Sequence, residues 1–313
     1  MTTTILRTAD AWWVRTDRGA ARIDTTATTT AELLANPEAI DAAHATSQTV
    51  DPCSLDLISP VTAPCRVVAQ MTNYASHVED AGLKPESIPL TFFRKTSGSI
   101  SGPYDDIVRP GHVRFLDYEA EIGIVIGREL PVGTQVTEDS WASYVAGLVV
   151  TNDVSARDVQ LPKTQFFEGK SYPTFTPVGP GLVLLTDDEL KRFGDLRLRL
   201  WVNGEPRQDA LVDDDMVYPP LEALQALSRF QRLDPGDLLL TGTPVGTALS
   251  APAKPVEVIA SLLPAATKWR MFFKGQARNP KYLQVGDVVE VAVATDDGAI
   301  DLGRQLTVIK GAR

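Results

Sequence analysis

Short apolar runs separated by turn residues dominate the chain after residue 65, and they predict a body built mainly of strands. These runs cover Arg66–Met71, Leu90–Arg94, Tyr118–Gly127, Tyr144–Asn152, Gly181–Leu185, Leu196–Val202, Asp237–Thr241, Asp287–Ala294 and Leu306–Ile309. The spacing of Leu221, Leu224 and Leu227 after two prolines predicts one of the few helices. Many strands with occasional helices favour a mixed α/β, mainly β, sandwich-like body over a doubly wound sheet.

The first 65 residues follow a different pattern. Strand-like pieces at Trp12–Arg15 and Ala21–Asp24 precede Ala-rich helical patterns at Ala31–Asn36 and Glu38–Ala45. A proline-containing stretch before Cys65 is a plausible connector. We therefore predict a small N-terminal domain over residues 1–65 and a second, larger domain over residues 66–313.

Composition and charge exclude several classes of protein. The 313 residues include 40 Asp or Glu and 30 Lys or Arg, a net charge of −10, which argues against nucleic acid or an anionic membrane as a partner. With two Cys and three His, any metal site is expected to use oxygen ligands and to hold a hard cation. Because no membrane-length apolar run or secretory pattern is present, the cytoplasm is the expected compartment.

Three acidic residues form the candidate metal site. Glu119 and Glu121 share one face of a predicted strand, about 7 Å apart, where a cation would relieve their repulsion. The next apolar strand ends at Asp153, which would complete a site of three carboxylates. Two other interpretations stay open here: surface acids on a half-solvated strand, and a helix-capping role for Asp153.

Five motifs, in their order and spacing, resemble the fumarylacetoacetate hydrolase family: LDYEAEIGIVIG, TNDVSARDVQ, GKSYPTFTPVGPG, VNGEPRQD and LLLTGTPVG. The resemblance runs over residues 66–247 and resumes at YLQVGDVVEV. It implies a catalytic domain of the β-roll or sandwich type that this family has, a small N-terminal domain and a homodimer. It also implies that Glu119, Glu121 and Asp153 hold Mg²⁺ or Mn²⁺, with Ca²⁺ as a substitute in a crystal.

The resemblance further implies roles for individual side chains. His77 matches the general base that activates water, and Asp80 stands where the family has a Glu that assists it. Lys170 matches a lysine near the metal and the reaction centre. The positions implied to bind substrate are Arg157, Gln160, Thr174 and Thr243. Without the resemblance, His77 fits a helix-surface histidine beside acids equally well.

The chain departs from the family pattern at two places. Pro173 replaces an Asp that is common in short members, and this leaves the subclass open. An insertion over residues 248–278 is locally basic: it contains Lys254, Lys268, Arg270, Lys274 and Arg278 against Glu257. We interpret it as a lid or a dimer contact, with an outer packing element as the alternative.

The family chemistry implies a hydrolase that cleaves a carbon–carbon bond in an anionic 2-oxo acid or 1,3-dicarbonyl substrate, such as an acylpyruvate or a fumarylacetoacetate-like diketone. Water activated by His77 would attack a carbonyl, and the metal would stabilise the resulting enolate. The same enolate serves a decarboxylase, a hydratase or a keto-enol isomerase in aromatic-compound catabolism, so these stay open. A noncatalytic metal-binding scaffold is a further alternative, against which the retained His77 and Lys170 argue.

Overall fold

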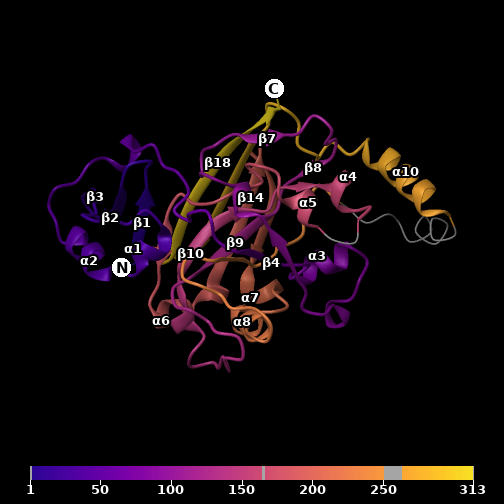
Figure 1. Ribbon diagram of the computed structural model, residues 1–313. Coiled ribbons are helices and arrows are strands. Elements are labelled where there is room, and N and C mark those ends of the chain that lie inside the picture. Colours follow the sequence, from indigo (N-terminus) through magenta and orange to yellow (C-terminus); the bar gives the residue numbers. More distant parts are fainter. Residues whose placement is uncertain (1, 164–165, 250–262, 313) are drawn as a thin grey trace.

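The computed structural model describes residues 2–163, 166–249 and 263–312, and its largest element is a nine-stranded sheet (Figure 1). The strand order is β3-β2-β1-β13-β10-β9-β16-β4-β5. These strands are β1 (Thr3–Arg7), β2 (Trp12–Thr16), β3 (Gly19–Arg22), β4 (Val67–Gln70), β5 (Phe92–Lys95), β9 (Ala120–Ile126), β10 (Val145–Asn152), β13 (Leu182–Leu184) and β16 (Leu238–Leu240). The predicted strand-rich, mixed α/β fold class is confirmed.

A five-stranded sheet of order β15-β14-β17-β18-β7 packs against the first. Its strands are β7 (Ile107–Arg109), β14 (Leu196–Val202), β15 (Glu205–Leu211), β17 (Val288–Thr295) and β18 (Asp301–Gly311). Two short pairs join β8 (Leu116–Asp117) to β11 (Ser155–Ala156), and β6 (Ile100–Ser101) to β12 (Thr176–Pro177). Along β14 every second residue is buried, as expected of a strand with one face on the core.

Strand β9 is buried at every position because apolar layers cover both of its faces. Ile122 and Ile124 belong to the core shared with the five-stranded sheet. Val125 points to the other face and joins a second core that includes residues of the N-terminal segment, such as Trp12 and Leu33. A continuous apolar run in the sequence is the expected signature of such a doubly covered strand.

The N-terminal segment continues the larger sheet, since β1 pairs antiparallel with β13. Helices α1 (Thr30–Leu34) and α2 (Pro37–His44) follow β3, and Thr29 and Glu32 form a capping box at the start of α1. Figure 1 shows this segment at one end of the molecule and α10 (Ala265–Gln276) at the other. The division into domains at residue 65 stays a prediction.

The remaining α-helices of the described chain are α3 (Ala75–Asp80), α4 (Arg157–Gln160), α5 (Phe167–Lys170), α6 (Asp187–Leu190), α7 (Val212–Asp215) and α8 (Pro220–Ser228). Helix α8 begins at the predicted proline pair and buries Leu224 and Leu227. None of the helices in the described ranges is long and apolar enough to cross a membrane.

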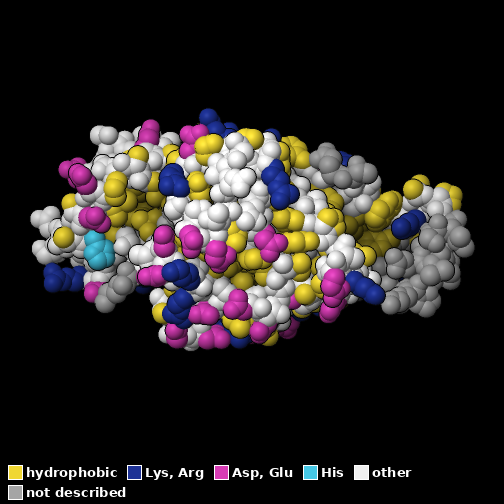
Figure 2. Space-filling model, turned by 90° about the horizontal axis from the view of Figure 1, so that it is seen from below, with side chains coloured by type: hydrophobic (Ala, Val, Ile, Leu, Met, Phe, Trp, Pro, Cys, Tyr) yellow, Lys and Arg dark blue, Asp and Glu magenta, His cyan; other side chains and the backbone are white. Residues whose placement is uncertain are grey.

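Helix α10 lies within the predicted insertion, whose residues 250–262, including Lys254 and Glu257, lie outside the described residues. No residue of α10 is buried, yet Phe273 stacks on Phe115 of the body with ring centroids 5.3 Å apart. Figure 2 shows apolar side chains at this end of the molecule, and Met271 is half exposed there. Whether the insertion acts as a lid or a dimer contact stays a prediction.

Candidate active site

The three predicted metal ligands lie together in the interior. Glu119 immediately precedes β9 and Glu121 lies within it, while the antiparallel register of β9 and β10 brings Asp153 beside Glu119. The backbone N–H of Asp153 donates to the carbonyl of Glu119 at 2.9 Å. All three side chains are buried, and each offers a carboxylate oxygen within 4.8 Å of the others. Their burial rules out the alternative of ordinary surface acids.

Two buried lysines neutralise part of this charge. Lys170, the last residue of α5, donates to Glu119 Oε2 at 2.6 Å and to Asp153 Oδ2 at 2.7 Å. Lys95, at the end of β5, contacts the other oxygen of Asp153 and donates to the carbonyl of Phe175 at 2.8 Å. Burial lowers the pKa of Lys95, whereas Asp153 and Glu119 outweigh burial and raise the pKa of Lys170.

Arg157 connects the metal-ligand candidates to β8, the short strand before β9. Its Nη2 donates to Glu119 Oε1 at 2.5 Å, its Nε to Asp117 Oδ2 at 2.8 Å, and its Nη1 to Gln160 Oε1 at 2.9 Å. Asp117 also accepts the N–H groups of Ala248 and Leu249, at 2.7 and 3.0 Å, so it ties the beginning of the insertion to Arg157. The predicted substrate residues Arg157 and Gln160 are therefore buried in one network with Glu119.

The carboxylates differ in how well their charge is compensated. Although burial opposes it, Lys170, Arg157 and His77 lower the pKa of Glu119 to about 2. Glu121 accepts the N–H of Gly242 at 2.9 Å, but burial and the charges of Asp153 and Glu119 raise its pKa well above its usual range. An additional cation among the three carboxylates would relieve this repulsion, so the residues present fit a hard divalent ion.

His77 lies on α3, the helix after β4, and burial lowers the pKa of its imidazole. Its Nδ1 is buried without a hydrogen-bond partner among the described residues. Asp80 is exposed at the end of the same helix and does not hydrogen-bond Nδ1 of His77. The assisting role of Asp80 stays a prediction.

Both predicted threonines use their hydroxyls within the protein. Thr174 has a left-handed backbone with φ of 70° and accepts the N–H of Val108 at 2.8 Å. Thr243 donates to the carbonyl of Ala120 at 2.9 Å and accepts from Gln208 Nε2 at 2.9 Å. The hydroxyl of Thr243 thus supports the backbone between the two glutamates, and substrate contact by either threonine stays a prediction.

Three buried residues of this centre were not predicted as site residues: Lys95, Asp117 and Gln208. Gln208 Oε1 accepts the N–H of Ala120 at 2.9 Å, between the two glutamates. Lys95 could have been predicted from the sequence, since it is a charged residue at the end of an apolar strand, as Asp153 is. No sequence pattern predicts Gln208, because its role depends on how β15 lies beside the loop after β16.

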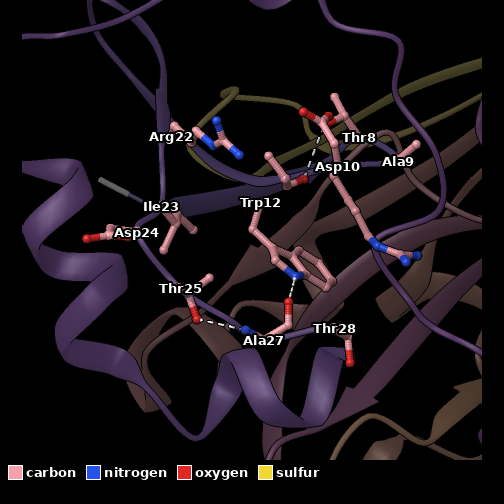
Figure 3. A pocket seen from close by; sticks show the side chains of 12 residues that line it. Thr8, Ala9, Asp10, Trp12, Arg22, Ile23, Asp24, Thr25, Ala27 and Thr28 are labelled. Atoms are coloured by element: carbon pink, nitrogen blue, oxygen red, sulfur yellow. Dashed lines mark hydrogen bonds between the residues drawn. The ribbon is translucent and has the colours of Figure 1, made fainter.

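A separate cavity of about 530 Å³ lies in the N-terminal segment, among residues 7–12 and 22–28 (Figure 3). Arg7 lies 5.1 Å above the ring of Trp12, whose Nε1 donates to the carbonyl of Ala27 at 2.8 Å. None of the described residues lining it belongs to the carboxylate centre. The chemistry-bearing groups are therefore elsewhere, at the ends of β9 and β10.

The chain is similar in sequence to known enzymes. Over 193 residues the chain is 38% identical to the mitochondrial oxaloacetate tautomerase Fahd2a of Rattus norvegicus. The aligned region covers 61% of this chain and 59% of that protein. The chain thus spans less than two thirds of the length of this relative. It is 33% identical over 267 residues to the 2,4-didehydro-3-deoxy-L-rhamnonate hydrolase of a Sphingomonas species, with 82% of each chain covered.

A solved structure is similar over the full length of both chains. It is a probable 2-hydroxyhepta-2,4-diene-1,7-dioate isomerase from Mycobacterium abscessus, with a TM-score of 0.75 and 29% sequence identity. Residues 66–308 match the family described as fumarylacetoacetate (FAA) hydrolase, C-terminal. These relatives are enzymes of the hydrolase, isomerase and tautomerase type. The chain belongs to the fumarylacetoacetate hydrolase family.

Proposed function

We propose that the protein is a divalent-metal-dependent hydrolase that cleaves a carbon–carbon bond in a 2-oxo acid or 1,3-dicarbonyl substrate, such as an acylpyruvate or a fumarylacetoacetate-like diketone. The observation that carries the proposal is the set of three buried carboxylates with ligand atoms within 4.8 Å of one another. Glu119, Glu121 and Asp153 would hold Mg²⁺ or Mn²⁺. When bound, the ion supplies a Lewis acid that polarises a carbonyl oxygen and stabilises enolate charge.

The cationic side chains suit an anionic substrate. An ammonium group has three N–H donors, and Lys170 uses two of them on Glu119 and Asp153, which leaves one for a substrate oxygen. Arg157 adds a second buried cation beside Glu119. Together they offset the negative charge of a substrate carboxylate next to three acidic residues.

His77 supplies the base. Because burial lowers its pKa, the imidazole is neutral near pH 7 and can take a proton from water. The hydroxide adds to the carbonyl carbon, the adjacent carbon–carbon bond breaks, and its electron pair passes to the 2-oxo acid fragment as an enolate. Return of the proton from His77 to that carbon releases the second product and restores the neutral imidazole.

Keto-enol isomerisation of a 2-oxo acid is the second candidate. The 38% identity with an oxaloacetate tautomerase favours it. So does Nδ1 of His77, which has no partner among the described residues, since isomerisation needs only proton transfer. Decarboxylation and hydration proceed through the same enolate and belong to the same set of candidates.

The test combines metal binding with product identification. Calorimetry on chelator-treated protein should show binding of Mg²⁺ or Mn²⁺, and the loaded protein should convert acylpyruvates, diketones or oxaloacetate to products identified by NMR. Glu121→Gln should lose both metal binding and turnover. Glu129→Gln is the control, since Glu129 is exposed at the end of the same stretch, and it should keep both. Full turnover by Glu121→Gln or by the chelator-treated protein would contradict the proposal.

The proposal includes a homodimer in the cytoplasm. The dimer rests on the family resemblance, and the compartment rests on the sequence pattern. Sedimentation equilibrium measures the first, and fractionation of the source cells measures the second.

A further inference from the structure

An apolar pocket of about 410 Å³ lies between the edge strand β5 and the beginning of α5. Its lining includes Met71, which follows β4, and four phenylalanines: Phe92, Phe93, Phe166 and Phe167. The whole chain contains ten phenylalanines, so aromatic side chains are concentrated here. The volume falls in the range of about 300–1,000 Å³ that is usual for sites of small molecules.

This apolar pocket adjoins the carboxylate centre through Phe93. Phe93 and Lys95 are two residues apart on β5 and therefore share a face of the sheet, the face on which Lys95 contacts Asp153. The ring centroid of Phe93 is 5.3 Å from Lys170 Nζ. Phe166 contacts Phe93 edge to face, with centroids 5.7 Å apart. Phe93 therefore contacts both Lys170 and Phe166, which brings the apolar pocket close to a ligand held at Lys170.

The polarity of the apolar pocket is opposite to that of the centre. Among its described lining residues the one charged side chain is Arg94, which is exposed and donates to Gln231 Oε1 at 3.2 Å. The phenylalanine rings offer a carboxylate no hydrogen-bond donor in exchange for its lost hydration, which is costly, and Arg94 is already hydrogen-bonded to Gln231. An uncharged alkyl or aryl group would gain from burial.

We propose that the apolar pocket binds the acyl substituent of the substrate, so that the preferred substrates are 2-oxo acids that carry an uncharged alkyl or aryl acyl group. This inference rests on the proposed function, because the charged head of the substrate must lie at Lys170. It narrows the substrate class from acylpyruvates and diketones in general to those without a second carboxylate on the tail.

Steady-state kinetics with a series of pyruvates acylated by acetyl, hexanoyl, benzoyl and succinyl groups tests the proposal on the Mg²⁺-loaded protein. Each buried methylene should raise kcat/KM about fourfold. Hexanoylpyruvate should therefore exceed acetylpyruvate by well over tenfold, and succinylpyruvate should be the poorest of the larger substrates. Phe166→Ala should lower the hexanoyl-to-acetyl ratio about tenfold, and Phe166→Leu should lower it less.

Phe230→Ala is the matched control, since Phe230 is a strongly exposed phenylalanine outside the apolar pocket. It should leave the ratio unchanged. A wild-type ratio near one, a preference for succinylpyruvate, or an unchanged ratio in both Phe166 variants would overturn the proposal.

Calorimetry separates this inference from the proposed function. The Mg²⁺-loaded protein should bind 2-oxooctanoate at least tenfold more tightly than pyruvate, and Phe166→Ala should remove most of that difference. If no acylpyruvate is hydrolysed but the binding difference is found, the reaction is wrong and the apolar pocket stands. If acylpyruvates are hydrolysed and the binding difference is absent, the apolar pocket is refuted alone.

Discussion

Asp215 holds the helix that carries His77, and replacing it by Asn should loosen that helix. Helix α3 has no capping side chain of its own at Tyr74. Instead, Asp215 at the end of α7 accepts the N–H of Ser76 at 2.6 Å with Oδ1 and the hydroxyl of Ser76 with Oδ2. Ser76 Oγ in turn accepts the N–H of Val245 at 3.1 Å. The carboxylate therefore acts as a cap supplied from a distant part of the chain.

The magnitude follows from these two contacts. Hydrogen bonds to a charged group contribute about 1.5–3 kcal/mol each, but Asn keeps one acceptor and the site is partly exposed. We expect Asp215→Asn to weaken α3 by about 1–2 kcal/mol, which raises the opened population roughly tenfold. The turnover number should fall by much less than tenfold, because a helix that opens rarely still holds His77 in place most of the time.

Hydrogen exchange and kinetics together measure the effect. The amides of Val78 and Ala81, which donate to Tyr74 and His77 within α3, should exchange roughly tenfold faster. Metal affinity should not change, because Asp215 does not contact the carboxylate centre. Asp214→Asn is the control on the same helix, since Asp214 is exposed. Amide exchange in α3 that matches that of the control would refute the reasoning.

Three further predictions concern other parts of the chain. Burial and the nearby Asp237 raise the pKa of Cys65 to about 12, so a disulfide reagent at pH 8 should modify the exposed Cys53 quickly and Cys65 only on unfolding, as mass spectrometry can show. Gly123→Ala should destabilise the protein by about 1–3 kcal/mol in urea unfolding, because its Cβ would lie 2.6 Å from Val149 Cγ2; an unchanged midpoint would count against this. The Thr295 hydroxyl and the Ala299 N–H lower the pKa of Asp297 to about 2, so its stabilising effect is present above about pH 4 and is lost as the pH falls toward 2. The difference in stability between wild type and Asp297→Asn should shrink over that window, and a constant difference would contradict the assignment.

The strands could be predicted where burial follows the sequence pattern. Leu196–Val202 alternates along its length, and β14 has the same bounds in the structure. Strand β1 was not predicted because its two apolar residues follow a run of threonines, and its conformation depends on pairing with β13. Strand β15 is mostly polar, and it is a strand because β14 lies beside it.

The metal-ligand candidates could be predicted because their positions follow from strand geometry and the family resemblance. Glu119, Glu121 and Asp153 lie together as expected, and Lys170 lies against two of them. Whether Asp80 contacts His77 could not be judged from their three-residue spacing. Whether two helix residues touch depends on how α3 lies against its neighbours, and here Asp80 faces solvent.

The pairing of β1 with β13 determines which piece of the chain can be produced alone. A fragment restricted to the family region would begin at residue 66 and would turn β13 from an internal strand into a sheet edge. It would also uncover apolar side chains such as Leu182 and Val149, which pack in the core shared with the N-terminal segment. Open edges of this kind recruit strands from other molecules. Expression trials of that fragment should therefore yield aggregates, whereas supplying residues 1–65 as a separate chain should restore soluble material.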